Sequence, residues 1–172
     1  PNARKMINDL FGDEGLTDRL FAHQRDLFFA LEDEILVPRE GALEALSALA
    51  DAGMTLALAT TTAREHAQAL MERFGMAPFF STMTFGDEIE RSKPAPDIYF
   101  EAARRLGVAP EVCAAVEDSM NGARAALAAG MATFLVPEWA EATPDVADAC
   151  AAVLGGLAEV PAAILGRTAV LA

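Results

Sequence analysis

The chain has 172 residues, of which 53% are hydrophobic, so it is long enough to bury one core and carry a small appendage. Its formal net charge is −13, and no stripe of Lys and Arg is present to neutralise phosphates, which argues against a nucleic-acid partner. Two cysteines give no disulfide framework, no stretch is long enough to span a membrane and the first residues lack the order of a signal peptide, so we expect a cytoplasmic protein with no membrane partner.

The first 36 residues have the apolar spacing of two helical pieces. Residues 37–41, Val-Pro-Arg-Glu-Gly, then punctuate the chain. We therefore expect a boundary at this point, between a small helical part at 1–36 and a larger domain at 37–172. The first helical piece is built on Met6, Ile7, Leu10 and Phe11, and the second on Leu20, Phe21, Leu27, Phe28, Leu31 and Ile35.

Residues 42–53 predict a helix that ends at a glycine, and residues 55–59 then form an apolar run of the kind buried in a parallel sheet. This strand delivers Thr60, Thr61 and Thr62 to its carboxyl end, and a helix follows from residue 63. A threonine hydroxyl and backbone N–H groups at a strand-to-helix turn suit a phosphate-sized anion. We expect Thr62 to cap the helix and Thr60 to face a ligand.

Residues 79–85 predict the next strand, and a loop from Gly86 leads to Lys93. Pro94 favours an extended conformation for the preceding residue, so the Lys93 ammonium projects from a stiffened backbone. The alternative is an ordinary solvated loop lysine. Pro96 suits the first turn of a helix, which Gly107 ends.

Residues 112–116 predict a short apolar strand, and Glu117 and Asp118 follow where it ends. In an open α/β sheet the carboxyl ends of the strands form the ligand crevice. Two adjacent carboxylates there suit Mg²⁺, which takes oxygen ligands and keeps several waters. The alternative is that the two acids only favour the N-terminus of the next helix, at 121–129.

The remaining residues predict a strand at 131–136, a loop with Trp139 as a packing residue, a short strand at 151–154 and a helix at 157–165. Strands that alternate with helices in this way predict an α/β fold with a doubly wound parallel sheet.

These patterns together resemble the haloacid dehalogenase (HAD)-like hydrolase superfamily over about residues 38–165. The resemblance rests on an apolar strand followed by Thr60, on Lys-Pro-x-Pro-x-x-Tyr from Lys93, and on an apolar strand followed by Glu-Asp-Ser-x-x-Gly from Glu117. Within the superfamily, the chain is most similar to the β-phosphoglucomutase and phosphoglycolate phosphatase type. The resemblance implies a Rossmann-like core, with residues 1–36 as part of an α-helical cap.

The resemblance also implies site roles and a cofactor. Thr60 and Lys93 would bind the transferring phosphoryl group, the N–H of Thr61 would assist, and Glu117 and Asp118 would hold Mg²⁺ directly or through water. The implied activity is phosphoryl transfer from a small phosphorylated metabolite through an aspartyl-phosphate, by a phosphatase or a phosphomutase. No feature of the sequence sets an oligomeric state.

One family motif, Asp-x-Asp-Gly-Thr after an apolar strand, has no counterpart in these residues. It carries the nucleophilic aspartate. The nearest candidate, at 13–17, has the wrong spacing and follows a segment of helical periodicity, so we reject it. In the family's fold this strand lies between the strands that end at Thr60 and Glu117. We therefore expect a gap between those strands, a truncated chain that is inactive alone, and a longer protein that supplies the strand.

Two alternatives remain open at this stage. The first is a catalytically inactive HAD-like module that binds phosphorylated ligands or a protein partner, which accounts for the missing aspartate without truncation. The second is a haloacid dehalogenase proper, whose chemistry needs no metal and leaves the Glu117–Asp118 pair without a purpose.

Overall fold

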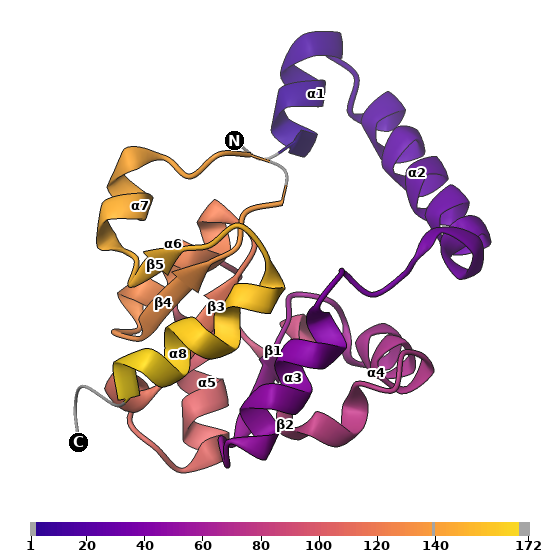
Figure 1. Ribbon diagram of the computed structural model, residues 1–172. Helices are drawn as coiled ribbons and strands as arrows, with labels where there is room; N and C mark the ends of the chain where they lie inside the picture. Colours follow the sequence, from indigo (N-terminus) through magenta and orange to yellow (C-terminus); the bar gives the residue numbers. More distant parts are fainter. Residues whose placement is uncertain (1–2, 139, 169–172) are drawn as a thin grey trace. The chain divides into compact units, whose positions relative to one another are not determined.

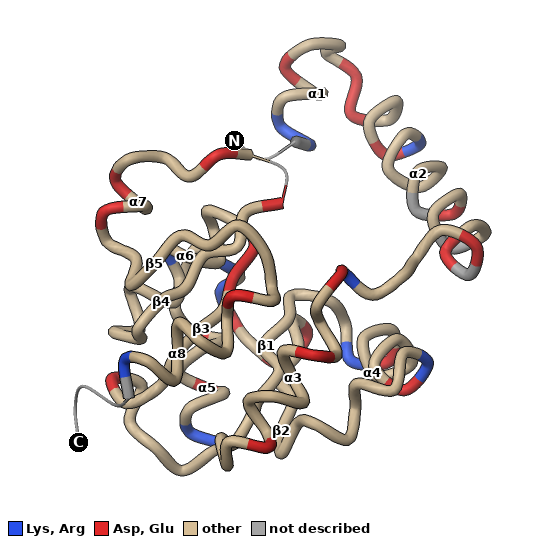
Figure 2. The backbone as a smooth tube through the Cα atoms, in the orientation of Figure 1, with Lys and Arg blue, Asp and Glu red and all other residues tan. Residues whose placement is uncertain are grey.

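The computed structural model describes residues 3–138 and 140–168, so the packing role predicted for Trp139 lies outside the described residues. The chain divides into two compact units, Pro1–Val37 and Pro38–Ala172. Each unit is described by itself below. Acidic side chains are spread over the elements of both units, in keeping with the strongly negative net charge (Figure 2).

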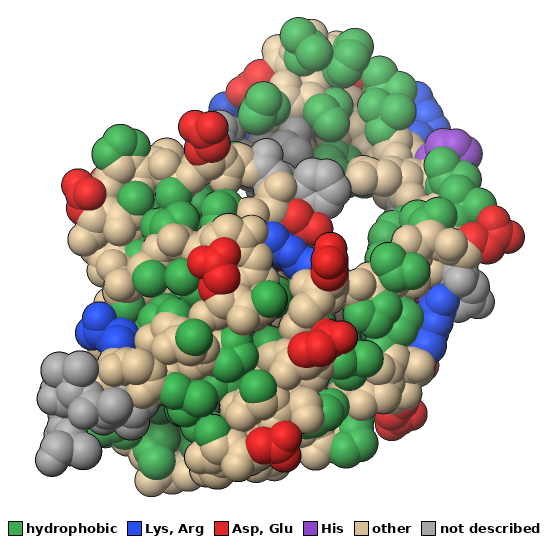
Figure 3. Space-filling model, viewed as in Figure 1, with side chains coloured by type: hydrophobic (Ala, Val, Ile, Leu, Met, Phe, Trp, Pro, Cys, Tyr) green, Lys and Arg blue, Asp and Glu red, His purple; other side chains and the backbone are tan. Residues whose placement is uncertain are grey.

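The small unit consists of two helices, α1 (Ala3–Phe11) and α2 (Glu14–Ile35), as the apolar spacing predicts. Asp13 caps α2 by accepting a hydrogen bond from the N–H of Leu16 at 3.0 Å. The acidic segment at 13–17 is therefore the start of a helix, and it follows a helix rather than a strand. Hydrophobic side chains stand exposed along both helices (Figure 3): Met6, Leu10, Phe11, Leu20, Leu27, Phe28, Leu31 and Ile35.

The described residues of the larger unit form five short parallel strands in two sheets. One sheet pairs β1 (Leu56–Ala59) with β2 (Phe80–Thr84). The other has the order β3 (Ala114–Glu117), β4 (Ala132–Leu135), β5 (Ala152–Val153). The predicted α/β class with parallel strands is confirmed. The predicted start of β3 at residue 112 is wrong, because a 3₁₀ turn occupies 110–112 and opens with a proline.

Six α-helices of this unit are described, and four single 3₁₀ turns lie between the longer elements. The helix predicted at 157–165 begins with such a turn, at 157–159. Helix α7 was not predicted; it is short and buries only Val146. The helices are α3 (Ala42–Asp51), α4 (Arg64–Arg73), α5 (Asp97–Leu106), α6 (Met120–Ala128), α7 (Pro144–Ala149) and α8 (Val160–Thr168).

The strands are covered on both faces, as a doubly wound arrangement requires (Figure 1). On one face, α5 and α6 pack in a cluster that includes Ala115 of β3. On the other face, α3 and α8 pack against Phe134 of β4 and Val136 just after it. Helix α6 buries alanines on its inner side, which lets its backbone approach the sheet closely. In the described part of the chain, no helix combines the length and apolar character needed to cross a bilayer.

Candidate functional site

Thr60 and Thr61 follow β1 directly, at the carboxyl edge of the first sheet. The Thr60 N–H continues the strand ladder by donating to the carbonyl of Thr84 at 3.0 Å. The Thr60 hydroxyl oxygen accepts from the N–H of Thr62 at 3.2 Å, which leaves its own hydrogen available to donate. Gly86 packs against the Thr61 backbone so closely that a side chain at 86 would clash, so the conformation of this turn is fixed.

The prediction that Thr62 caps α4 is wrong. Ala63, not Thr62, stands at the N-cap position, and no side chain caps from there. The carboxylate of Asp87 accepts from the Arg64 N–H instead, at 3.2 and 3.3 Å. Neighbouring Glu88 pairs with Arg64 and with Arg105. Both acids of this loop therefore stabilise the fold.

Lys93 lies in the loop before α5, and its peptide bond to Pro94 is cis. Its side chain is only 13% exposed, so the reading as a solvated loop lysine is wrong. The ammonium donates to the carbonyl of Ala59 at 3.3 Å and forms an ion pair with Glu117. One ammonium thus joins the residue before Thr60 to the last residue of β3.

The two acids that end β3 have different environments. Glu117 is buried, and its Oε1 atom accepts from Lys93 and from the hydroxyl of Tyr99. Asp118 is exposed. Ser119, and neither acid, supplies the side-chain cap of α6, by accepting from the Gly122 N–H at 3.1 Å. The predicted alternative, that these acids only start a helix, therefore does not describe Glu117.

Tyr99 is the tyrosine of the Lys-Pro-x-Pro-x-x-Tyr motif, but the sequence reasoning gave it no role at the candidate site. Its spacing with Ile98, Ala102 and Ala103 marks it as a core residue of α5, and it is indeed buried. Its hydroxyl nevertheless bonds to Glu117, and the Lys93 ammonium lies 5.1 Å from the centre of its ring. Burial, with Glu117 as the next cause, raises the pKa of Tyr99 above its usual value, so the phenol is a hydrogen-bond donor at neutral pH.

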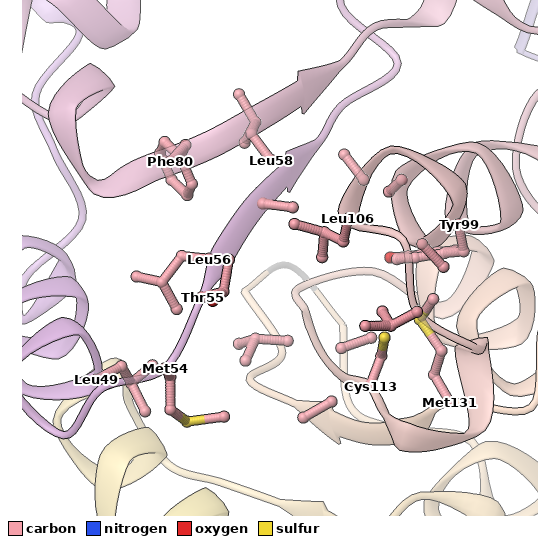
Figure 4. A pocket seen from close by; sticks show the side chains of 18 of the residues that line it. Leu49, Met54, Thr55, Leu56, Leu58, Phe80, Tyr99, Leu106, Cys113 and Met131 are labelled. Atoms are coloured by element: carbon pink, nitrogen blue, oxygen red, sulfur yellow. The ribbon is translucent and has the colours of Figure 1, made fainter.

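A cavity of about 510 Å³ is lined by all four residues of β1 and by Ala114, Ala115 and Val116 of β3. Its walls include residues 54–59 on one side and residues 112–116 on the other, and Figure 4 shows Leu106, Tyr99, Cys113 and Met131 across from β1. Among the described strands, β1 pairs only with β2 and β3 only with β4, so each leaves one edge without a strand partner. Lys93 contacts the last residue of each strand, Ala59 of β1 and Glu117 of β3, so the carboxyl ends of the two strands lie near each other.

A family model described as a haloacid dehalogenase-like hydrolase matches residues 3–130. The chain belongs to this family. A phosphorylated carbohydrates phosphatase of Thermotoga maritima is 38% identical over 98 residues, which are 57% of this chain and 45% of that protein. The chain spans about half the length of the curated relatives it matches.

Solved HAD structures agree in fold. A putative β-phosphoglucomutase from Thermotoga maritima aligns with a TM-score of 0.72 and 29% identity over 90% of this chain and 69% of that one. CbbY from Rhodobacter sphaeroides, solved in complex with xylulose-(1,5)bisphosphate, aligns with a TM-score of 0.68 and 31% identity over 83% of this chain and 65% of that one. The subgroup named from the sequence is thereby confirmed.

The chemistry of the donor set fits a hard divalent cation. Asp118 is an exposed carboxylate at a strand end, and Glu117 beside it retains a second oxygen whose one hydrogen-bond partner, the Ser119 hydroxyl, is 3.5 Å away. Mg²⁺ is usually held by one or two carboxylates together with substrate phosphate and water. In the described residues no group of three or more His, Cys, Asp or Glu side chains could hold a metal. Glu117 and Asp118 would thus supply only part of a magnesium site, with water and substrate phosphate as the remaining ligands.

Proposed function

We propose that the complete polypeptide catalyses Mg²⁺-dependent phosphoryl transfer from a small phosphorylated metabolite of the sugar phosphate class. The observation that carries this proposal is the Lys93 ammonium, which contacts the end of β1 and ion-pairs with the end of β3. In a chain of net charge −13, this ammonium lies at a strand edge next to Thr60, with its charge paired to Glu117 in the structure. The relatives' names support the substrate class, since they include a phosphorylated carbohydrates phosphatase and a complex with a sugar bisphosphate.

Three groups bind the transferring phosphoryl group in this proposal. Thr60 donates its hydroxyl hydrogen, the N–H of Thr61 assists, and Lys93 neutralises charge on the equatorial oxygens. Positioning and charge stabilisation of this kind account for most of the catalysis of phosphoryl transfer. Asp118 would hold Mg²⁺ directly and Glu117 would do so directly or through water; the ion would offset further negative charge on the phosphate.

The cavity between β1 and β3 supports a place for the nucleophile. Two parallel strands with open edges and apolar walls fit one further parallel strand, which would pair with both. The residue that ends such a strand would arrive beside Thr60, Lys93 and Asp118. We propose that polypeptide outside these 172 residues supplies this strand and an aspartate at its end, and that the chain alone is inactive.

The reaction then has two steps. A carboxylate oxygen of that aspartate attacks phosphorus as the bond from phosphorus to the substrate oxygen breaks, and the leaving oxygen takes up a proton. Water attacks the aspartyl-phosphate in the second step, which releases inorganic phosphate and restores the carboxylate. In a mutase a sugar hydroxyl takes the place of water.

The test is phosphate release from sugar phosphates by the complete polypeptide and its Asp118→Asn variant, in the presence of Mg²⁺. Asp118 is exposed, so we expect the variant to fold with a free energy of unfolding within about 0.5 kcal/mol of the parent. We expect it to lose turnover. Asp148→Asn, an exposed aspartate of α7, is the matched control and retains turnover. Near-normal phosphate release by Asp118→Asn would refute the assignment. Halide release from a haloacid, with no phosphate release from sugar phosphates, would favour a dehalogenase.

A further inference from the structure

Tyr99 contacts both members of the ion pair that the proposed function places at the phosphoryl group. Its hydroxyl donates to Oε1 of Glu117, the oxygen that Lys93 also engages. Its ring lies under the Lys93 ammonium, with 5.1 Å from the nitrogen to the ring centre. A cation over an aromatic face is attracted by the ring quadrupole. A single side chain of α5 therefore holds the carboxylate and the cation together.

The surroundings leave the Glu117 carboxylate little freedom. Its second oxygen, Oε2, lies at 3.5 Å from the Ser119 hydroxyl and fills the space that a β-carbon on residue 122 would need. The carboxylate is thus bounded by Lys93 and Tyr99 on one side and by the start of α6 on the other. These contacts on opposite sides restrict the plane of the carboxylate.

The Tyr99 hydroxyl is not needed to pack the ring into the core. The ring sits in the cluster formed by α5, α6 and Ala115, and Tyr99 is 6% exposed. A phenylalanine would fill the same space without a polar atom, and a buried hydroxyl is unfavourable unless it is hydrogen-bonded. The hydroxyl's partner in the structure is Glu117, so the hydroxyl serves that carboxylate.

We infer that Tyr99 is a positioning residue, which fixes the orientation of Glu117 and through it the place of the Lys93 ammonium at the phosphoryl site. Tyr99 itself touches no substrate in this arrangement. The expected effect on turnover rests on the proposed function, whereas the contact between Tyr99 and Glu117 rests on the geometry alone. Partners that orient the groups around a metal site are worth roughly tenfold to a hundredfold in activity when they are removed.

The activity test compares Tyr99→Phe with Thr133→Val in the complete polypeptide. Thr133 is a matched control, because it also buries a hydroxyl with one partner, the Met131 carbonyl at 3.1 Å, but lies in β4 away from the site. We expect both variants to melt a few degrees lower. Tyr99→Phe should lower kcat roughly tenfold to a hundredfold with KM little changed, whereas Thr133→Val keeps the parent kcat. Equal kcat values for the two variants would overturn the inference.

A second measurement does not depend on turnover. Thermal unfolding of Tyr99→Phe, Glu117→Gln and the double variant shows whether the two side chains are coupled. We expect the double variant to lose less in melting temperature than the two single variants together. Strictly additive losses would overturn the contact itself. If the polypeptide releases no phosphate while this coupling holds, the proposed function fails and the Tyr99–Glu117 contact stands.

Discussion

The carboxylate of Glu117 occupies the space above residue 122, where any side chain larger than hydrogen would collide with it. Gly122 is the third residue of α6, in the first turn of the helix, where glycine still costs more backbone entropy on folding than alanine does. The helix therefore carries a residue that weakens it locally, at the one turn that adjoins the buried acid. This pairing explains why a glycine stands inside the Glu-Asp-Ser-x-x-Gly segment.

Gly122→Ala should consequently destabilise the protein, although alanine favours the helix. Overpacking of this kind costs about 1–3 kcal/mol, which exceeds the gain in helix propensity. Gly166→Ala is the matched control, since Gly166 lies in α8 with open space around its Cα, and it should stabilise by roughly 0.5–1 kcal/mol. Urea unfolding measures both, and equal stabilisation by the two changes would contradict the packing account.

Breaking the Lys93–Glu117 pair should cost far more than a surface ion pair would. Both side chains are largely buried, at 13% and 6% exposed, and removal of one partner leaves the other charge uncompensated at a cost of about 3–5 kcal/mol. We expect Lys93→Met to show this loss in denaturant unfolding. Lys93→Met combined with Glu117→Gln should recover part of it, because no buried charge is then left alone. Equal losses in the single and double variants would argue against coupling.

The free energy of unfolding should decrease at acid pH, in part because the carboxylate of Glu101 in α5 becomes protonated. Hydrogen bonds from Arg104, and then from Arg105, lower the pKa of Glu101 from 4.5 to about 2. A carboxylate with a lowered native pKa contributes stability that is complete above the unfolded pKa and is lost as the pH falls through the native one. Arg105 also donates to the Met83 carbonyl at 2.7 Å, so this contact ties α5 to β2.

Glu101→Gln should remove the pH-dependent part of the stability that the Glu101 carboxylate contributes. Between about pH 4.5 and pH 2, the free energy of unfolding of the parent should fall more steeply than that of the variant. The two should differ most at higher pH and converge at the acid end. Guanidinium titrations at several pH values give the two curves. Parallel curves through the window would show that Glu101 makes no such contribution.

The open strand edges give a prediction for hydrogen exchange. Amides on the free sides of β1 and β3 lie along the cavity and lack strand partners in the described residues, so they should exchange fast in this chain. Amides of β4, which pairs with β3 and β5, should be protected in the same sample and serve as the internal reference. In an upstream-extended polypeptide, β1 and β3 should become as protected as β4. Unchanged exchange there would contradict the proposed strand.

The sequence predicted the strand ends well because each apolar run stops at a polar residue. The run before Thr60 and the run before Glu117 both end within one residue of the observed strands. Lys93 could be singled out from its two prolines alone. Short elements escaped prediction, since α7 buries only Val146 and gives almost no periodic signal.

What the sequence did not predict are contacts between residues far apart in the chain. Tyr99 has the spacing of a core residue, and nothing near it reveals that its hydroxyl reaches Glu117, 18 residues later. Asp87 replaces Thr62 as the partner of the α4 N-terminus because β1 and β2 lie side by side, which brings the two strand ends together. Local patterns therefore singled out candidate site residues, and tertiary pairing decided what each one contacts.

The most direct test of the whole account is phosphate release from a generic aryl phosphate, measured with and without Mg²⁺. It should be made on this chain and on a version extended upstream. We predict turnover only for the extended version and only with Mg²⁺, because in our proposal the extension would supply the strand and its aspartate and Asp118 would supply a metal ligand. Metal-independent turnover, or no turnover by an extended version that folds and binds phosphate, would contradict the account, and the second result would favour a binding module.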